Sequence, residues 1–319
     1  MKRSVLNIDC YGHRTAKSLD VTCEQTQLRF RFEDGKSEAM RYHLGLFLDY
    51  FATTGRSYLR YPKRLRIAVL SEPNTSVPFF EDVNLCNRFA IVLTHDARLL
   101  ERGFPYRELV FGTNWLGDDS LERRDYNKIR LVSMIGAHHQ NPVAGHVLRN
   151  EVIARLANRS GVDRFGKGVK WIDSKMDGLA DYAFSIAMEN CSRDAYFSEK
   201  IIDCLLTETV PIYYGCDGIH RYFDERGLIS FQSVDELESI LDSLSWQRYE
   251  QMRPFVLQNR DRAISQKWAT RPQLYERIAA EILDHYGCLN RHASPTLFRI
   301  AQDVRHRMRR VSRSPRDRK

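Results

Sequence analysis

Long apolar runs are missing from this sequence, and none approaches the roughly 20 residues that a membrane-spanning helix needs. Residues 1–9 also lack the apolar core of a secretion signal. The seven cysteines are odd in number and form neither a C-x-x-C pair nor a spacing typical of zinc fingers. These absences predict a cytoplasmic protein whose cysteines are reduced.

Internal repeats and low-complexity stretches are absent too, apart from the basic C-terminal end. Of the 319 residues, 43% are hydrophobic and 28% are charged, which is typical of a globular protein and excludes a disordered one. This length is sufficient for two domains of ordinary size.

Positive charge is concentrated at the C-terminal end. Residues 299–319 hold nine Lys or Arg and two Asp, or +7 of the net charge of +8, so residues 1–298 carry only about +1. Such an end is most often a solvated tail, and its functional alternative is attachment to anionic lipid on the inner face of the membrane. Nucleic acid is not an expected partner, because the tail offers no aromatic platform for bases. We set residues 291–319 apart as a basic tail.

The first part of the chain alternates short apolar strands with helix-like segments. Strands are expected at 4–8, 66–70, 89–93 and 109–113, and helices at 37–53 and 96–102. Strands that alternate with helices pair in parallel through crossovers, so this pattern predicts an α/β domain, which we place at 1–125. The charged segment 121–128 is interpreted as a linker.

A second α/β domain is expected at 126–290. Its strands are predicted at 129–135, 183–188, 210–215 and 228–231, and its helices at 146–158, after Ser198, after Ser233, at 246–258 and at 272–286. Two such domains place a cleft between the carboxyl ends of two sheets, where open α/β proteins bind ligands.

The helix that follows Ser198 carries the most informative charges. Ser198 is a plausible N-cap, and Lys200 then lies in the first helical turn. A cation is disfavoured there by the helix dipole, which suggests that an anion such as phosphate is bound nearby. The alternative is a surface Glu–Lys pair at an ordinary helix start.

Residues 187–215 resemble the donor-binding motif of the α-1,3/1,4-fucosyltransferase family, glycosyltransferase family 10. They read A-M-E-N-C-S-R-D-A-Y-F-S-E-K and end in V-P-I-Y-Y-G, where the family has an F/M-E-N run, Y-x-T-E-K and a V-P-V/I-x-G strand. Segments 131–149 and 163–166 are similar to the family as well. The resemblance extends from about 129 to 245 and is absent from the tail.

The resemblance implies a GT-B type fold, with two Rossmann-like domains that face a cleft, and a glycosyltransferase activity. Arg149 and Lys200 would contact the diphosphate of GDP-fucose, and Glu199 would hold ribose or fucose hydroxyls. Tyr196 and Asn190 would line the nucleotide-sugar pocket. Fucose would be transferred to a hydroxyl of a glycan acceptor.

The catalytic base implied by the resemblance is Glu72. The segment from Ser71 to Pro78 looks like the family's G-E-N-x-x-P loop, although Pro73 stands where the family has Asn. Transfer with inversion requires such a base for the acceptor proton and cations for the departing diphosphate. Asp96 and Glu81 are the alternative carboxylates.

No Asp-x-Asp motif, the usual metal anchor of the other common sugar-nucleotide architecture, occurs in the sequence. Its absence favours a metal-independent enzyme without a cofactor besides the donor. His138 and His139 are adjacent and lack companion ligands, so a metal role is disfavoured, whereas His146 lies beside the expected anion site.

Several interpretations remain open at this point. The donor could be another nucleotide sugar, or the chain could be a non-catalytic protein of the same fold that docks on membrane or nucleic acid. Trp115 could cover an acceptor sugar or be buried in the core. Tyr213 and Tyr214 are expected to pack in the sheet, and the cysteines nearest the motif, Cys191, Cys204 and Cys216, are expected to be buried and inert.

Overall fold

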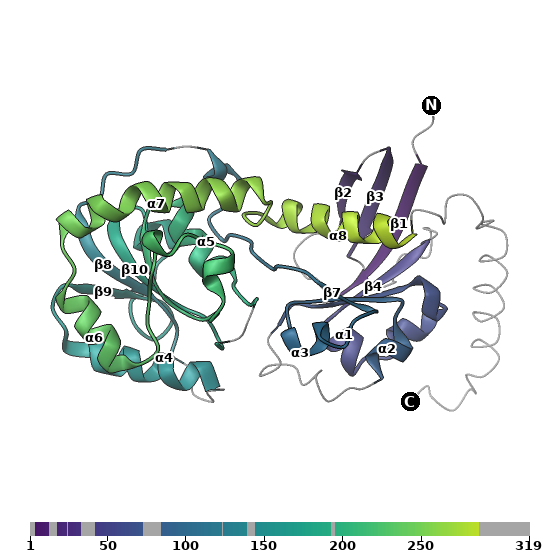
Figure 1. The fold of residues 1–319 in the computed structure, drawn as a ribbon, viewed down its shortest axis with the longest axis horizontal. Helices are drawn as coiled ribbons and strands as arrows, with labels where there is room; N and C mark the ends of the chain where they lie inside the picture. The colour runs from purple at the N-terminus through teal and green to yellow at the C-terminus, as the bar shows by residue number, and fades with distance from the viewer. Residues whose placement is uncertain are drawn as a thin grey trace, which may run out of the picture.

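The molecule consists of two lobes, each built on its own β-sheet (Figure 1). The computed structural model describes residues 4–12, 18–23, 25–32, 42–72, 84–122, 124–138, 144–192 and 195–286. Helices cover the faces of both sheets, as expected for an α/β protein. Among the described residues, no helix is both long and apolar enough to cross a membrane.

The first lobe contains a seven-stranded sheet in which β2 is the one antiparallel strand. In spatial order the strands are β2 (Ser18–Cys23), β3 (Thr26–Arg31), β1 (Ser4–Tyr11), β4 (Leu44–Leu48), β5 (Arg66–Leu70), β6 (Ile91–Thr94) and β7 (Tyr106–Glu108). The central strand, β4, lies where a helix was expected at 37–53, so among the described residues of that range only 50–53 are helical as expected. All five residues of β4 are buried, and a continuous apolar run does not distinguish a central parallel strand from a buried helix.

The two faces of the first sheet are covered by segments far apart in the sequence. The short helices α1 (Tyr50–Thr53), α2 (Leu85–Arg88) and α3 (Ala97–Leu100) contribute buried residues to one face. The opposite face packs against α8 (Arg271–Tyr286), through Tyr275, Ile278 and Ile282. Helix α8 therefore packs with the first lobe, although it lies within the range 126–290 that the sequence assigned to the second.

The second lobe contains a parallel five-stranded sheet. Its order is β12 (Ile229–Ser230), β11 (Val210–Tyr214), β10 (Tyr182–Met188), β8 (Arg130–Ile135) and β9 (Val162–Phe165). Its helices are α4 (Ala144–Arg155), α5 (Glu199–Leu206), α6 (Val234–Asp242) and α7 (Trp246–Ser265). The strands and helices expected here are confirmed, with boundaries that shift by a few residues.

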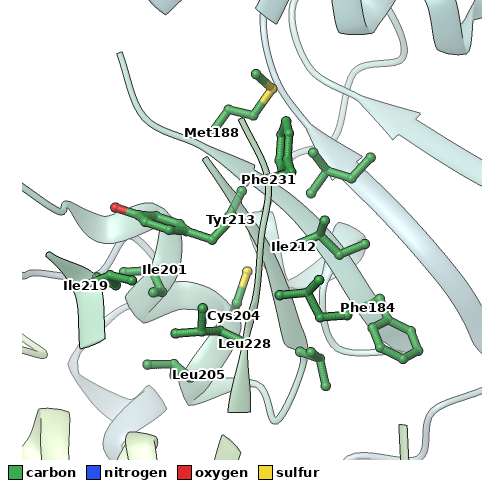
Figure 2. Close-up of a cluster of buried hydrophobic side chains, with 14 of the residues drawn as sticks. Phe184, Met188, Ile201, Cys204, Leu205, Ile212, Tyr213, Ile219, Leu228 and Phe231 are labelled. Atoms are coloured by element: carbon green, nitrogen blue, oxygen red, sulfur yellow. The ribbon is translucent and has the colours of Figure 1, made fainter. Parts of the chain in front are cut away.

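The core of the second lobe forms between α5 and the central strands (Figure 2). Ile201, Cys204 and Leu205 of α5 are buried close to Ile212 and Tyr213 of β11. The expected burial of Cys191, Cys204, Cys216 and Tyr213 is confirmed. This packing fixes the N-terminal end of α5 next to the carboxyl end of β10.

The lobes are joined by two chain segments, one that follows β7 and one that links α7 to α8, and the two segments contact each other. Asn114, which follows β7, donates its amide Nδ2 to the Ala269 carbonyl between α7 and α8, at 2.6 Å. The carbonyls of Val110 and Gly112 accept hydrogen bonds from Arg277 of α8. The strand expected at 109–113 is therefore wrong, because these backbone groups bond to a side chain of α8, and the sheet ends at β7.

Candidate functional site

A buried carboxylate, Glu189, marks the carboxyl end of the central strand β10. Its Oε1 accepts hydrogen bonds from the Ser198 backbone N at 2.8 Å and from Ser198 Oγ at 2.9 Å. Its Oε2 lies 2.7 Å from Ser198 Oγ and 3.0 Å from Lys200 Nζ. A fully buried carboxylate is tolerated when it is paired in this way, so Glu189 fixes the start of α5.

Helix α5 begins as the sequence predicted, with Ser198 as its N-cap and Lys200 in its first turn. The ammonium of Lys200 lies 3.0 Å from Glu189 and 3.4 Å from Glu199. Burial by itself lowers the pKa of Lys200, but the two carboxylates raise it above its ordinary value. The anion that a cation in the first turn requires is thus supplied by the protein itself, and a ligand is not needed to explain Lys200.

Arg149 of α4 is buried and reaches the end of β10. Its Nη2 donates to the Met188 carbonyl at 2.6 Å and to Asn190 Oδ1 at 2.9 Å. Burial lowers the pKa of Arg149, whereas the negative charges of Glu189 and Glu199 favour its cationic form. The structure therefore brings together Arg149, Asn190, Glu199 and Lys200, four of the residues selected from the sequence.

A second set of charges continues from Glu199 along α5. Lys175, in a short 3-10 turn (Lys175–Gly178), lies 3.5 Å from Glu199 Oε1 and 2.7 Å from Asp203 Oδ2. Burial raises the pKa of Asp203 to about 6, against the opposing charge of Lys175. Asp203 Oδ1 also accepts the Trp115 backbone N–H at 2.9 Å, which ties the segment between the lobes to α5.

Trp115 is 69% exposed, so it is not buried in the core. The Lys175 ammonium lies 4.5 Å from the ring centre, a cation–π contact. Sequence reasoning had missed Glu189, Lys175 and Asp203 as parts of this network. One signal was present, because Asp203 interrupts the apolar stripe of α5 one turn after Glu199.

Tyr196 lies at the contact between the two lobes. Its ring is 4.8 Å from the ring of His95, which follows β6 of the first lobe. Both side chains are buried, and burial lowers the pKa of His95 to about 4, so the imidazole is neutral at pH 7. The nearby backbone of Glu72 raises the pKa of His95, which opposes the effect of burial. Neither ring nitrogen of His95 forms a hydrogen bond of ordinary geometry. The lobes therefore meet at the carboxyl ends of both sheets.

Glu72 follows β5 at this same end of the first sheet. Its side chain is exposed, yet the surrounding protein still raises its pKa through desolvation. The negative charge of Asp49 raises the pKa further, while Lys200 of the second lobe opposes the shift. Glu72 is therefore accessible to solvent, and its pKa depends on the charges of Lys200 and Glu199 in α5.

The alternative carboxylates differ from Glu72. Asp96 is buried and caps α3, where its Oδ1 accepts the Arg98 backbone N–H at 3.0 Å. Helix capping accounts for Asp96 without a catalytic role. Glu81 lies outside the described residues.

The family is identified by the second lobe. The model of glycosyltransferase family 10 (fucosyltransferase), C-terminal part, matches residues 124–279. These residues, just under half of the chain, form a domain of glycosyltransferase family 10. The match contains the whole second sheet together with Arg149, Asn190, Tyr196, Glu199 and Lys200.

Two curated relatives share short segments with this chain. The alpha-(1,3)-fucosyltransferase FucT of Helicobacter pylori is 25% identical over 75 residues, which are 24% of this chain and 16% of the relative. An alpha-(1,4)-fucosyltransferase of Arabidopsis thaliana is 30% identical over 78 residues, 24% of this chain and 20% of the relative. The similarity thus covers a fifth or less of each relative's length.

The fold of this chain is GT-B. A crystal structure of an alpha1,3-fucosyltransferase superposes with a TM-score of 0.52 and 16% identity, over 78% of this chain and 81% of that one. A structure of an alpha1,3-fucosyltransferase with GDP gives the same values. The two Rossmann-like lobes expected from the sequence are confirmed.

Two of the three histidines singled out near the motif lie within the described residues. His138 is exposed after β8, His139 lies outside the described residues, and His146 is half-buried on α4. Across the described ranges, no three His, Cys, Asp or Glu side chains are grouped to hold a metal ion.

The close approach of Gly215 to Glu189 gives a first prediction. A Cβ on Gly215 would lie 2.6 Å from Glu189 Cγ and would also contact the Tyr213 hydroxyl. We expect Gly215→Ala to displace Glu189 and to lower the free energy of unfolding by about 1–3 kcal/mol, measured by denaturant titration. Gly136→Ala is the control, because its Cβ would meet the flexible end of Met134 at 3.3 Å. Equal stability of both variants would contradict the tight packing around Glu189.

Proposed function

We propose that this chain transfers fucose from GDP-fucose to a hydroxyl of a glycan acceptor, with inversion and without a metal ion. The observation that carries the proposal is the placement of Arg149 and Lys200 around the buried Glu189, within a matched family 10 domain. The relatives named fucosyltransferases and the neighbouring structure with GDP support the choice of donor.

The charges of the site indicate which cation meets the diphosphate. Lys200 and Lys175 are paired with carboxylates of the protein. The hydrogen-bond partners shown for Arg149 are instead neutral, a carbonyl and an amide oxygen. Arg149 is therefore the main anion anchor in this proposal, because a guanidinium binds phosphate oxygens through charge-assisted hydrogen bonds. Lys200 adds charge from a position fixed by Glu189.

Two further side chains bind the donor in this proposal. Burial opposes ionisation of Glu199, but Lys200 and Lys175 lower its pKa, so it accepts hydrogen bonds from ribose or fucose hydroxyls as a carboxylate. Asn190 holds Arg149 and borders the nucleotide. Tyr196 contributes to the pocket wall where it meets His95.

Glu72 is the catalytic base of the proposed reaction. It removes the proton of the acceptor hydroxyl while that oxygen forms a bond to the anomeric carbon of fucose. The bond from this carbon to the phosphate oxygen breaks, and GDP leaves with the electron pair. Attack opposite to the departing phosphate inverts the anomeric centre. The raised pKa of Glu72 suits a base, because proton transfer is most efficient when the pKa approaches the working pH.

The basic tail remains a separate hypothesis. Residues 291–319 lie outside the described residues, and we propose that they attach the enzyme peripherally to anionic lipid on the cytoplasmic side. Deleting 299–319 then changes recovery with membranes and leaves donor turnover intact. A full-length chain without donor turnover, whose docking is abolished by the deletion, would favour the alternative of a docking protein without catalysis.

Thermal unfolding with different nucleotides tests the donor assignment. At about 100 times the dissociation constant, a ligand stabilises the folded state by about 2.7 kcal/mol, so GDP and GDP-fucose should raise Tm by roughly 5 °C in the presence of chelator. UDP should have little effect. A larger shift with UDP would favour a different nucleotide sugar, and a shift or activity that requires manganese would contradict metal independence.

A further inference from the structure

A second carboxylate, Asp49, lies beside Glu72 at the carboxyl end of the central strand β4. Its Oδ1 accepts the backbone N–H groups of Ser71 at 2.7 Å and of Glu72 at 3.0 Å. Its Oδ2 accepts the Ser71 hydroxyl at 2.6 Å. The Asp49 backbone N–H donates to the Val69 carbonyl at 2.9 Å. Asp49 thus bridges the ends of two neighbouring strands and holds the first two residues after β5.

The backbone of Asp49 is strained. Its φ of 40° and ψ of −106° are disfavoured for any residue with a Cβ, and glycine would adopt them at lower cost. Such strain persists where the surrounding structure enforces it, and it is common at functional sites. The three hydrogen bonds to its carboxylate explain why an aspartate occupies this position.

We propose that Asp49 is the positioning residue of Glu72: its carboxylate fixes the backbone that carries Glu72, and its charge faces the Glu72 carboxyl. The inference rests on the proposed function, in which Glu72 is the base. Nothing in the family motif assigns a role to Asp49, which lies outside the matched residues 124–279.

The electrostatics of Glu72 make this role measurable. Desolvation raises its pKa first, followed by the charge of Asp49, and Glu199 adds a smaller rise. Lys200 acts in the opposite direction. Burial also raises the pKa of Asp49, while its hydrogen bonds from Glu72 and Ser71 favour the ionised form. Removing the Asp49 charge therefore lowers the pKa of Glu72, and a base of lower pKa stays active to lower pH.

Three variants test the proposal, with GDP release from GDP-fucose measured between pH 4 and 9. Asp49→Gly relieves the backbone strain but removes the three hydrogen bonds that the Asp49 carboxylate accepts from Ser71 and Glu72. We expect kcat to fall by about 10- to 100-fold and KM for GDP-fucose to stay within about threefold of wild type. Asp49→Asn keeps polar atoms that can form hydrogen bonds to Ser71 and Glu72, so the loss in kcat should be smaller than in Asp49→Gly. Because the negative charge is removed, the acid limb of the pH–rate profile should move to lower pH. Ser71→Ala removes one of the three hydrogen bonds and should change kcat by only a few-fold.

The outcomes separate this inference from the proposed function. If Glu72→Gln is inactive while Asp49→Asn retains the wild-type pH profile, Asp49 has only a structural role and the inference is wrong. If Glu72→Gln retains full activity, the base assignment itself fails. Should Asp49→Gly not fold, the displacement of the acid limb in Asp49→Asn decides the question alone.

Discussion

Glu72→Gln should lower kcat by about 10²- to 10⁴-fold, the range that a general base contributes to catalysis. Glutamine has nearly the shape of glutamate but does not accept the proton of the acceptor hydroxyl. Because Glu72 lies on the first lobe and the proposed donor-binding residues lie on the second, affinity for GDP should stay within about twofold of wild type. Turnover of GDP-fucose and GDP titration by thermal shift measure the two quantities separately.

Two control substitutions make the Glu72 experiment specific. Glu101→Gln changes an exposed carboxylate of the same lobe and should leave kcat unchanged. Asp96→Asn tests the alternative base, and it should also retain turnover, because asparagine caps a helix about as well as aspartate. If Asp96→Asn is inactive and Glu72→Gln is not, the base must be reassigned to Asp96.

Local patterns predicted the second lobe well, for a physical reason. Alternation of large and small residues defined β10, and the Ser198 cap and apolar stripe defined α5, so the place of Lys200 followed from short-range sequence. The grouping of Arg149 with Lys200 was implied by the family resemblance. In the first lobe the helices α1, α2 and α3 are only four residues long, too short to show a helical period.

Features that depend on long-range contacts were not visible in the sequence. The return of α8 to the first sheet depends on contacts with β-strands more than 170 residues earlier in the chain. The ion pair between Glu189 and Lys200 also depends on tertiary structure, because it forms where the carboxyl end of β10 meets the first turn of α5. The dipole argument correctly required an anion near Lys200, but it did not distinguish a bound phosphate from a buried carboxylate of the protein.

The difference between a bound phosphate and a carboxylate of the protein leads to different expectations for Lys200 and Arg149, the two cations of the proposed donor site. Removing Lys200 leaves the buried Glu189 without its cation, and breaking a buried pair in this way costs about 3–5 kcal/mol of stability. Lys200→Met should therefore lower Tm as well as donor affinity. Glu189→Gln in the Lys200→Met background should restore part of the stability, because no uncompensated charge remains buried.

Arg149→Met should instead affect binding far more than stability. The contacts shown for Arg149 are with neutral groups, so its loss leaves no buried carboxylate unpaired, whereas truncating one partner of a buried charge pair costs about 2–5 kcal/mol of binding. At 1.4 kcal/mol per tenfold, affinity for GDP and GDP-fucose should fall by roughly 30- to 4,000-fold, measured by calorimetric titration. Arg155→Met, which removes a half-exposed arginine from the end of the same helix, is the matched control and should bind GDP normally. Normal GDP affinity in Arg149→Met would place the diphosphate elsewhere and overturn the donor site, since Lys200 is already neutralised by the protein.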